Sequence, residues 1–248
     1  MTTHRLLPGA VVCVPKSQRD DYAGVLAGGA DRGLPLPLSK RLLTHPDSVK
    51  GLTPKLNWIL ERFADEDAIV LIDDDIVSVQ RCFTEPGENA TIREPQLIEA
   101  IIRNTAILAR DMDAYYFGWE ASNGALRYFT GLKPIMLTGY INGCAMGFRK
   151  GHGLRFDERI VAKNDFDIAA MNAHKHRLCV KDCRYTFCQK ETFTGRGGQS
   201  AFRTSATEKR DVALLQKKWG DIFNFGGHSG TRKRDYAGVQ KITMNLPF

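Results

Sequence analysis

Three consecutive carboxylates, Asp73, Asp74 and Asp75, follow directly on the apolar run at residues 68–72. The run is typical of a fully buried strand, which ordinarily stops where its polar groups reach solvent. Adjacent like charges repel, so the fold must either solvate them or neutralise them with a divalent cation. In open α/β sheets ligands bind at the carboxyl ends of strands. The segment therefore predicts a metal site, with a solvated acidic turn as the alternative.

The segments before the acidic run alternate between strand and helix. Residues 9–15 indicate a first buried strand, and residues 16–38 a loop-rich crossover. Residues 53–63 predict a helix, with a capping threonine, an early proline and apolar residues three and four positions apart. This helix leads into the acidic strand. The order predicts a single α/β domain with a mixed, mostly parallel sheet flanked by helices.

The rest of the chain continues with helices and extended segments. A helix is expected from residue 95 to 108, and strands at residues 114–119 and 178–187. Further extended segments are expected at residues 128–130 and 134–138, and a short terminal segment at residues 239–246. Residues 139–148 are extended but interrupted by glycines, which let a ligand or another backbone come close. Helices are predicted from residue 164 to 173 and from 205 to 219.

Two more groups of polar residues are candidates for a site. Asp165 and Asp167 lie at a helix start, where an N-cap accounts for one aspartate but not for two. The glycine-rich stretch at residues 191–200 contains Arg196, and such loops commonly close over anionic ligands; disorder is the alternative. Lys40 and Arg41 are adjacent cations that suit a pyrophosphate, with a plain surface position as the alternative.

Charge and cysteine content narrow the class of protein. The 248 residues carry a formal charge of +7 and a pI near 9.1, with basic residues concentrated in the C-terminal third. This indicates an anionic partner, nucleic acid or nucleotide, or else a solvated basic face. The six cysteines are expected to be reduced core residues. A zinc cluster is the alternative, but Cys144, Cys179, Cys183 and Cys188 lack paired Cys-x-x-Cys spacing.

The sequence contains no apolar run long enough to span a bilayer and no signal-peptide pattern at its start. A cytoplasmic protein is therefore expected, in the host cytoplasm if the source is viral. The oligomeric state is left open.

Taken in order, these pieces resemble a GT-A glycosyltransferase. The resemblance covers residues 10–187: a first strand, a helix feeding Ile-Asp-Asp-Asp, the segment Gly-Tyr-Ile-Asn-Gly-Cys-Ala-Met-Gly-Phe at 139–148, and Asn-Asp-Phe-Asp at 164–167. Within that fold the chain is most similar to the TET/JBP-associated glycosyltransferases. Their inferred substrates are hydroxymethylated bases in DNA, such as 5-hydroxymethylcytosine. The resemblance implies a nucleotide-sugar half at about residues 8–110 and an acceptor half at 111–248.

The resemblance also implies roles for the candidate residues. Asp73 and Asp75, on one face of the strand, would hold Mn²⁺ or Mg²⁺ against the diphosphate of a nucleotide sugar, a UDP-sugar first of all. Asp74 would contact the ribose or act through water. His228, in a glycine-rich turn, would be a third metal ligand, a surface histidine being the alternative. Arg196, Lys40 and Arg41 would contact the pyrophosphate.

Asp165 would be the base that deprotonates the acceptor hydroxyl, with Asp167 as second choice. Inverting members of the family have a Glu-Asp pair there, whereas this chain has Asn164 before Asp165. Inversion and retention therefore both stay open. Two other functions also stay open: a glycosyltransferase with a protein, glycan or small-molecule acceptor, and a non-catalytic nucleic-acid-binding domain.

Overall fold

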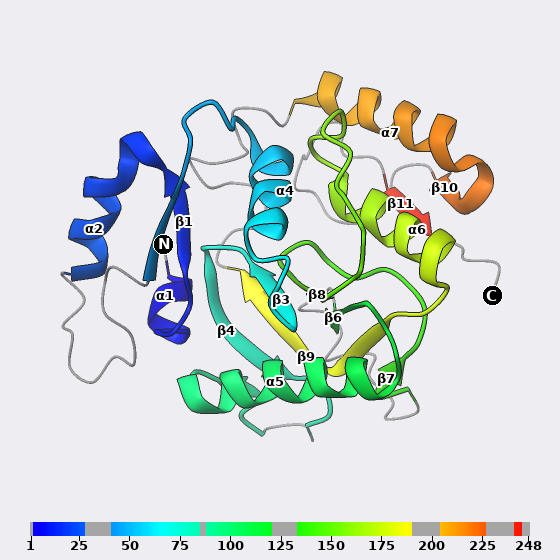
Figure 1. Ribbon diagram of the computed structural model, residues 1–248. Coiled ribbons are helices and arrows are strands. Elements are labelled where there is room, and N and C mark those ends of the chain that lie inside the picture. Colours follow the sequence, from blue (N-terminus) through cyan, green and yellow to red (C-terminus); the bar gives the residue numbers. More distant parts are fainter. Residues whose placement is uncertain are drawn as a thin grey trace.

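A seven-stranded mixed sheet lies at the centre of the computed structural model, which describes residues 2–27, 41–84, 88–120, 133–189, 204–226 and 241–244 (Figure 1). The strand order is β3-β8-β6-β9-β4-β5, and β7 also pairs with β9. The strands are β3 (Ala68–Ile72), β4 (Ile76–Arg81), β5 (Thr91–Ile92), β6 (Tyr116–Glu120), β7 (Ile135–Met136), β8 (Ala145–Arg149) and β9 (Val180–Gln189).

Strand pairing in this sheet is mostly antiparallel, so the prediction of a mostly parallel sheet is wrong. Among the described strands of this sheet, β6 and β9 form the one parallel pair. β8 returns between β3 and β6 and runs antiparallel to both, and β4 and β7 also run antiparallel to β9. The two halves expected from the resemblance therefore contribute interleaved strands to one sheet.

The expected first strand forms outside this sheet. β1 (Val12–Pro15) pairs in parallel with β2 (Leu42–His45), and α2 (Arg19–Ala27) lies between them in the chain. The short 3₁₀ helix η1 (Lys16–Gln18) links β1 to α2. The stretch expected to be loop-rich thus contains a helix, and its residues 28–38 lie outside the described chain.

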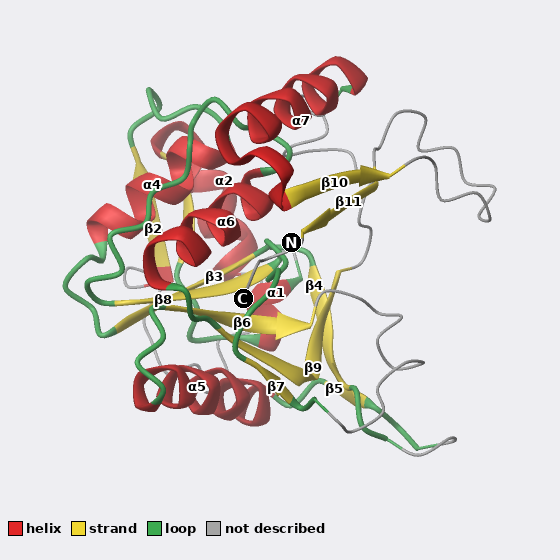
Figure 2. Cartoon of the chain, turned by 90° about the vertical axis from the view of Figure 1, so that its right-hand side faces the viewer, coloured by secondary structure: helices red, strands yellow, loops and turns green. Residues whose placement is uncertain are grey.

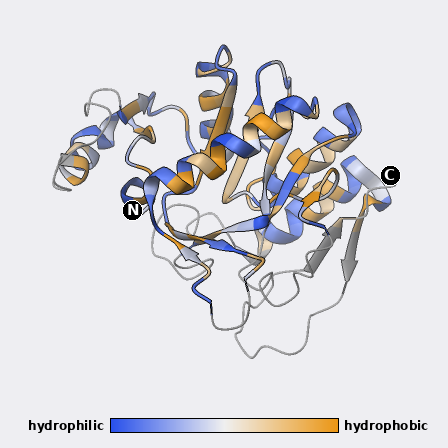
Figure 3. Cartoon of the chain, turned by 90° about the horizontal axis from the view of Figure 1, so that it is seen from below, coloured by the Kyte–Doolittle hydropathy of each residue, from blue (hydrophilic) through white to orange (hydrophobic). Residues whose placement is uncertain are grey.

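Helices cover both faces of the central sheet (Figure 2). α5 (Pro95–Asp111) lies on one face, and α4 (Leu52–Arg62) and α6 (Asn164–His176) lie on the other, with α7 (Ser205–Trp219) outside α6. All four are predicted helices, and the structure confirms them. In α5 the buried residues Ile98, Ile101, Thr105 and Ala109 follow helical spacing. Hydrophobic and hydrophilic residues accordingly alternate around the helices in Figure 3.

β3 is less buried than its sequence predicts. Within the described chain it has one neighbour, β8, and only Leu71 is fully buried. Leu71 and Ile69 pack with the cluster that contains Tyr116 and Phe148. Val70 and Ile72 point to the opposite side and pack with residues of α5. The prediction of a fully buried strand is wrong because β3 is an edge strand, although both of its faces are covered.

The remaining elements lie at the two ends of the chain. α1 (Thr3–Leu6) packs against β4. After α7, η4 (Gly220–Ile222) leads to β10 (Phe223–Gly226), which pairs antiparallel with β11 (Lys241–Met244). β11 lies within the terminal segment at residues 239–246. The expected segment at 128–130, the loop at 191–200 and the turn residues 227–230 lie outside the described residues.

All six cysteines are free thiols. Cys13 is half-buried, and the other five are buried, as expected for core residues: Cys82, Cys144, Cys179, Cys183 and Cys188.

Candidate active site at the end of β3

The acidic segment forms the turn between β3 and β4. Gln189, the last residue of β9, reaches this turn because β9 pairs with β4 and Gln189 lies opposite Ile76. Its Nε2 donates to Asp73 Oδ2 at 3.0 Å and to Asp75 Oδ1 at 3.1 Å, while Asp74 is exposed. Asp73 and Asp75 thus share a side, as expected, but a turn produces this arrangement and not the alternation of a strand.

The amino-terminal segment fixes the backbone of the turn. The Thr3 hydroxyl donates to the carbonyl of Asp73 and accepts from the amide of Ile76 at 3.0 Å. The amides of Thr2 and Thr3 donate to the carbonyl of Asp74 at 2.8 and 3.2 Å. Sequence reasoning missed both threonines, since nothing local indicates a contact 70 residues away.

The turn concentrates negative charge in a partly buried place. Burial, followed by the charges of Asp75 and Asp74, raises the pKa of the Asp73 carboxyl from 3.8 to about 7. Lys55 on α4 opposes this rise, and Asp165 adds to it. The Asp73 carboxylate is therefore costly to ionise until a cation approaches it. Lys55 is a further residue that sequence reasoning missed, because it was seen only as part of a helix.

The donor set fits a hard divalent cation. Asp73 and Asp75 present oxygens that converge on a single amide nitrogen, and carboxylate oxygens suit Mg²⁺ and Mn²⁺. No group of three or more His, Cys, Asp or Glu side chains able to hold a metal occurs within the described ranges. Mg²⁺ is commonly held by one or two carboxylates together with substrate phosphates and water. Asp73 and Asp75 would hold such an ion.

Asp165 lies in the first turn of α6 in a fixed orientation. The hydroxyl of Tyr140 donates to Oδ2, and the backbone amide of Phe166 donates to Oδ1 at 3.0 Å. The Tyr140 ring stacks on the Phe166 ring, with centroids 4.4 Å apart and planes at 19°. Burial raises the pKa of Asp165, and the bond from Tyr140 opposes the rise. Burial and Asp165 raise the pKa of Tyr140 well above its usual value, so Tyr140 remains the donor.

The start of β8 brings Asp165 and the acidic turn together. The amide of Asp73 donates to the carbonyl of Cys144 at 2.9 Å. Burial, and then the charges of Asp73, Asp75 and Asp165, raise the pKa of the Cys144 thiol. A Cβ on Gly143 would lie 3.3 Å from the Asp165 Cβ. The glycine predicted to allow a close approach therefore makes room for the carboxylate of α6.

Asp167 has a different setting from Asp165. It is fully buried; its carboxylate accepts from Lys218 Nζ at 2.8 Å and from Trp219 Nε1 at 2.7 Å. These contacts join α6 to α7 and account for Asp167 by packing. Of the two candidate bases, Asp165 is the one whose charge reaches the acidic turn.

Of the three residues predicted to contact the pyrophosphate, only Arg41 lies within the described ranges. Arg41 is 2% exposed and is therefore no surface cation. Arg41 lies near His4 of α1. Burial lowers the pKa of His4 most, and the positive charges of Arg5 and Arg41 lower it further. Asp74 lies near Tyr22 of α2. Burial raises the pKa of Tyr22 most, and the negative charge of Asp74 raises it further. Lys40, Arg196 and His228 fall outside the described residues.

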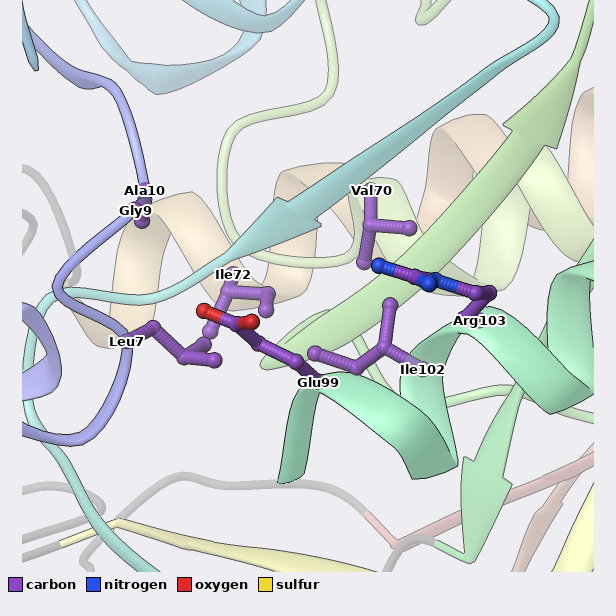
Figure 4. A pocket seen from close by; sticks show the side chains of 8 residues that line it. All are labelled: Leu7, Gly9, Ala10, Val70, Ile72, Glu99, Ile102 and Arg103. Atoms are coloured by element: carbon purple, nitrogen blue, oxygen red, sulfur yellow. The ribbon is translucent and has the colours of Figure 1, made fainter. Parts of the chain in front are cut away.

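A groove of about 340 Å³ lies on the other side of β3, between the amino-terminal segment and α5 (Figure 4). Apolar side chains of β3 and α5 line it, among them Val70, Ile72 and Ile102, with Glu99 and Arg103 as its charged residues. None of Asp73, Asp75 and Asp165 lines this groove, so it is separate from the candidate site.

No protein-family model, curated protein or solved structure matches the chain. Among the described residues, no helix is long and apolar enough to cross a membrane.

Proposed function

We propose that this protein is a metal-dependent glycosyltransferase that moves a sugar from a nucleotide sugar to a hydroxymethylated pyrimidine base in DNA. The observation that carries the proposal is the convergence of Asp73 and Asp75 on one donor, with Asp165 within electrostatic reach. Two carboxylates for a cation and a third carboxylate as base suit a metal-dependent transfer in which the acceptor hydroxyl directly displaces the diphosphate.

In this reaction Asp165 accepts the proton of the acceptor hydroxyl while that oxygen attacks the anomeric carbon of the sugar. The bond from this carbon to the diphosphate oxygen breaks, and its electron pair leaves with the nucleoside diphosphate. A divalent cation at Asp73 and Asp75 would stabilise the charge on this leaving group. Tyr140 and the Phe166 amide orient both oxygens of Asp165. Lys55 adds positive charge beside Asp73.

The acceptor is proposed from chemistry and charge. A hydroxymethyl group on a pyrimidine C5 faces the major groove, so an enzyme reaches it without flipping the base out of the duplex. The formal charge of +7 favours a polyanionic acceptor over a neutral glycan.

Nucleoside diphosphate release from a panel of nucleotide sugars with Mn²⁺, with and without hydroxymethylated DNA, tests the proposal. We expect release that hydroxymethylated DNA stimulates and that Asp73→Asn and Asp75→Asn abolish. Sugar transfer to a protein, glycan or small molecule without such stimulation would refute the DNA acceptor alone. DNA binding that is independent of divalent cations, with no turnover of any nucleotide sugar, would indicate a non-catalytic binding domain.

A further inference from the structure

The outer face of α7 carries cations and no carboxylate. Its exposed residues are spaced three and four positions apart: Ala206, Lys209, Arg210, Ala213, Gln216 and Lys217. The only acidic residues of this helix, Glu208 and Asp211, are 3% and 0% exposed. Three positive charges thus stand among small or neutral side chains on a regular, accessible surface.

The buried carboxylates of α7 are used for docking the helix. Glu208 pairs with Lys163 at 2.7 Å, and both side chains are buried. Asp211 Oδ2 accepts from the backbone amides of Val161 and Ala162 at 2.9 and 2.6 Å. Glu208 is therefore consumed on the inner face of α7, whereas the Oδ1 atom of Asp211 also pairs with Arg210 at 3.2 Å and offsets part of that one charge.

The same contacts place α7 beside the candidate base. The segment from Val161 to Asp167, on which α7 rests, leads into α6 and contains Asp165. Figure 2 shows α7 as the outer helix next to α6. Packed helices have axes about 8–10 Å apart, so the cationic face lies about one helix diameter from the start of α6.

Helix stability explains only part of this pattern. Cations near a helix C-terminus interact favourably with the helix dipole, which accounts for Lys217. Lys209 and Arg210 lie toward the N-terminal end, where the dipole gives them no such advantage. Arg210 donates to the carbonyl of Arg159 and to Asp211 Oδ1, both at 3.2 Å, and its side chain remains 55% exposed.

We infer that Lys209, Arg210 and Lys217 bind the phosphate backbone of nucleic acid. Lys209 and Lys217 are about 12 Å apart along the helix, which matches three to four nucleotides at about 3.4 Å each. Phosphate contacts position a duplex without reading its sequence, so this face would hold the acceptor while Asp165 reaches the base. The identity of the acceptor in this inference rests on the proposed function, whereas the charge pattern of α7 is independent of catalysis.

Binding of an unmodified fluorescent DNA duplex, measured by anisotropy between about 50 and 200 mM salt, tests the inference without any sugar transfer. The test variant is Lys209→Gln/Arg210→Gln/Lys217→Gln. The matched control, Arg93→Gln/Arg103→Gln/Arg110→Gln, removes the same charge from exposed positions at and before α5, on the opposite side of the sheet. Thermal melting of both variants checks that they fold.

We expect the α7 variant to bind at least about tenfold more weakly and to lose about 2–3 units of slope in log K against log salt. The α5 control should stay within about twofold of wild type. Equal losses in both variants, or no loss in the α7 variant, would overturn the inference. Displacement of the duplex by polyglutamate at equal charge concentration would overturn it in favour of an acidic protein partner. Asp73→Asn should bind this duplex normally, so the surface and the proposed chemistry can fail separately.

Discussion

The Tyr140 hydroxyl donates a hydrogen bond to Asp165, two residues that belong to different segments and meet at the start of α6. A carboxylate that accepts a hydrogen bond from a group unable to ionise is stabilised in its charged form. Tyr140 therefore favours the ionised form of a buried candidate base and holds its Oδ2 atom in place. Tyr140 acts as a positioning residue in this account.

Tyr140→Phe should change the pH dependence of sugar transfer. The bond from Tyr140 lowers the pKa of Asp165, so its loss raises that pKa. Because the base must be ionised, the acidic limb of kcat/KM should move to higher pH, with full activity regained in alkaline buffer. Asp165→Asn should lower kcat by about 10²–10⁴ at every pH. An acidic limb that stays in place would contradict the role of Tyr140.

Asp73 should make the metal-free protein less stable as pH rises. Its pKa of about 7 lies above the ordinary value of 3.8, so the folded state holds an extra proton between these values. The free energy of unfolding should therefore fall from about pH 4 to pH 7 and then level off. Thermal melting of Asp73→Asn should show a smaller fall over this range. Identical pH dependence in both proteins would contradict the assignment.

Gly143→Ala should impair sugar transfer more than folding. The added Cβ would lie 3.3 Å from Asp165 Cβ and 3.4 Å from the end of Met146, so Asp165 must shift. We expect about a tenfold fall in kcat/KM, because small displacements of a catalytic group are costly. Gly24→Ala in α2 is the control, since its Cβ meets nothing within 4 Å and should stabilise by about 0.5–1 kcal/mol. Full activity in Gly143→Ala would show that Asp165 has room to move.

Lys218→Met should loosen α7. It leaves the fully buried Asp167 without its ion-pair partner, which should lower the free energy of unfolding by about 3 kcal/mol in chemical denaturation. Arg110→Met removes an exposed pair with Asp111 and should cost about 0–1 kcal/mol. If both variants lost the same stability, the Asp167 contacts would not be what secures α7.

Local patterns in the sequence were sufficient for the helices. An early proline and apolar spacing lie within one segment, so α4, α5, α6 and α7 could be predicted from their own residues. The expected cap was wrong, because Thr53 lies inside α4 and its hydroxyl donates to the carbonyl of Ile160 at 2.9 Å. The sheet could not be predicted in this way, since its mostly antiparallel pairing and the edge position of β3 among the described strands depend on contacts between distant segments, such as the insertion of β8 beside β3.

The residues of the candidate site also fall into two groups, those that a local pattern predicted and those that it did not. Asp73, Asp75 and Asp165 were predicted because each carboxylate ends a strand or begins a helix. Gln189 and Thr3 were not, since they contact Asp73 across 116 and 70 residues of chain. Long-range partners of this kind leave no local signal.

Binding of Mn²⁺ in the presence of a nucleoside diphosphate, followed by electron paramagnetic resonance, tests the central claim most directly. Wild type should bind one Mn²⁺, and Asp73→Asn and Asp75→Asn should each weaken binding by at least about tenfold, while Mn²⁺ binding by the exposed Asp74→Asn stays close to wild type. Mn²⁺ binding that is unchanged in Asp73→Asn and Asp75→Asn, or weakened equally in all three variants, would contradict the account.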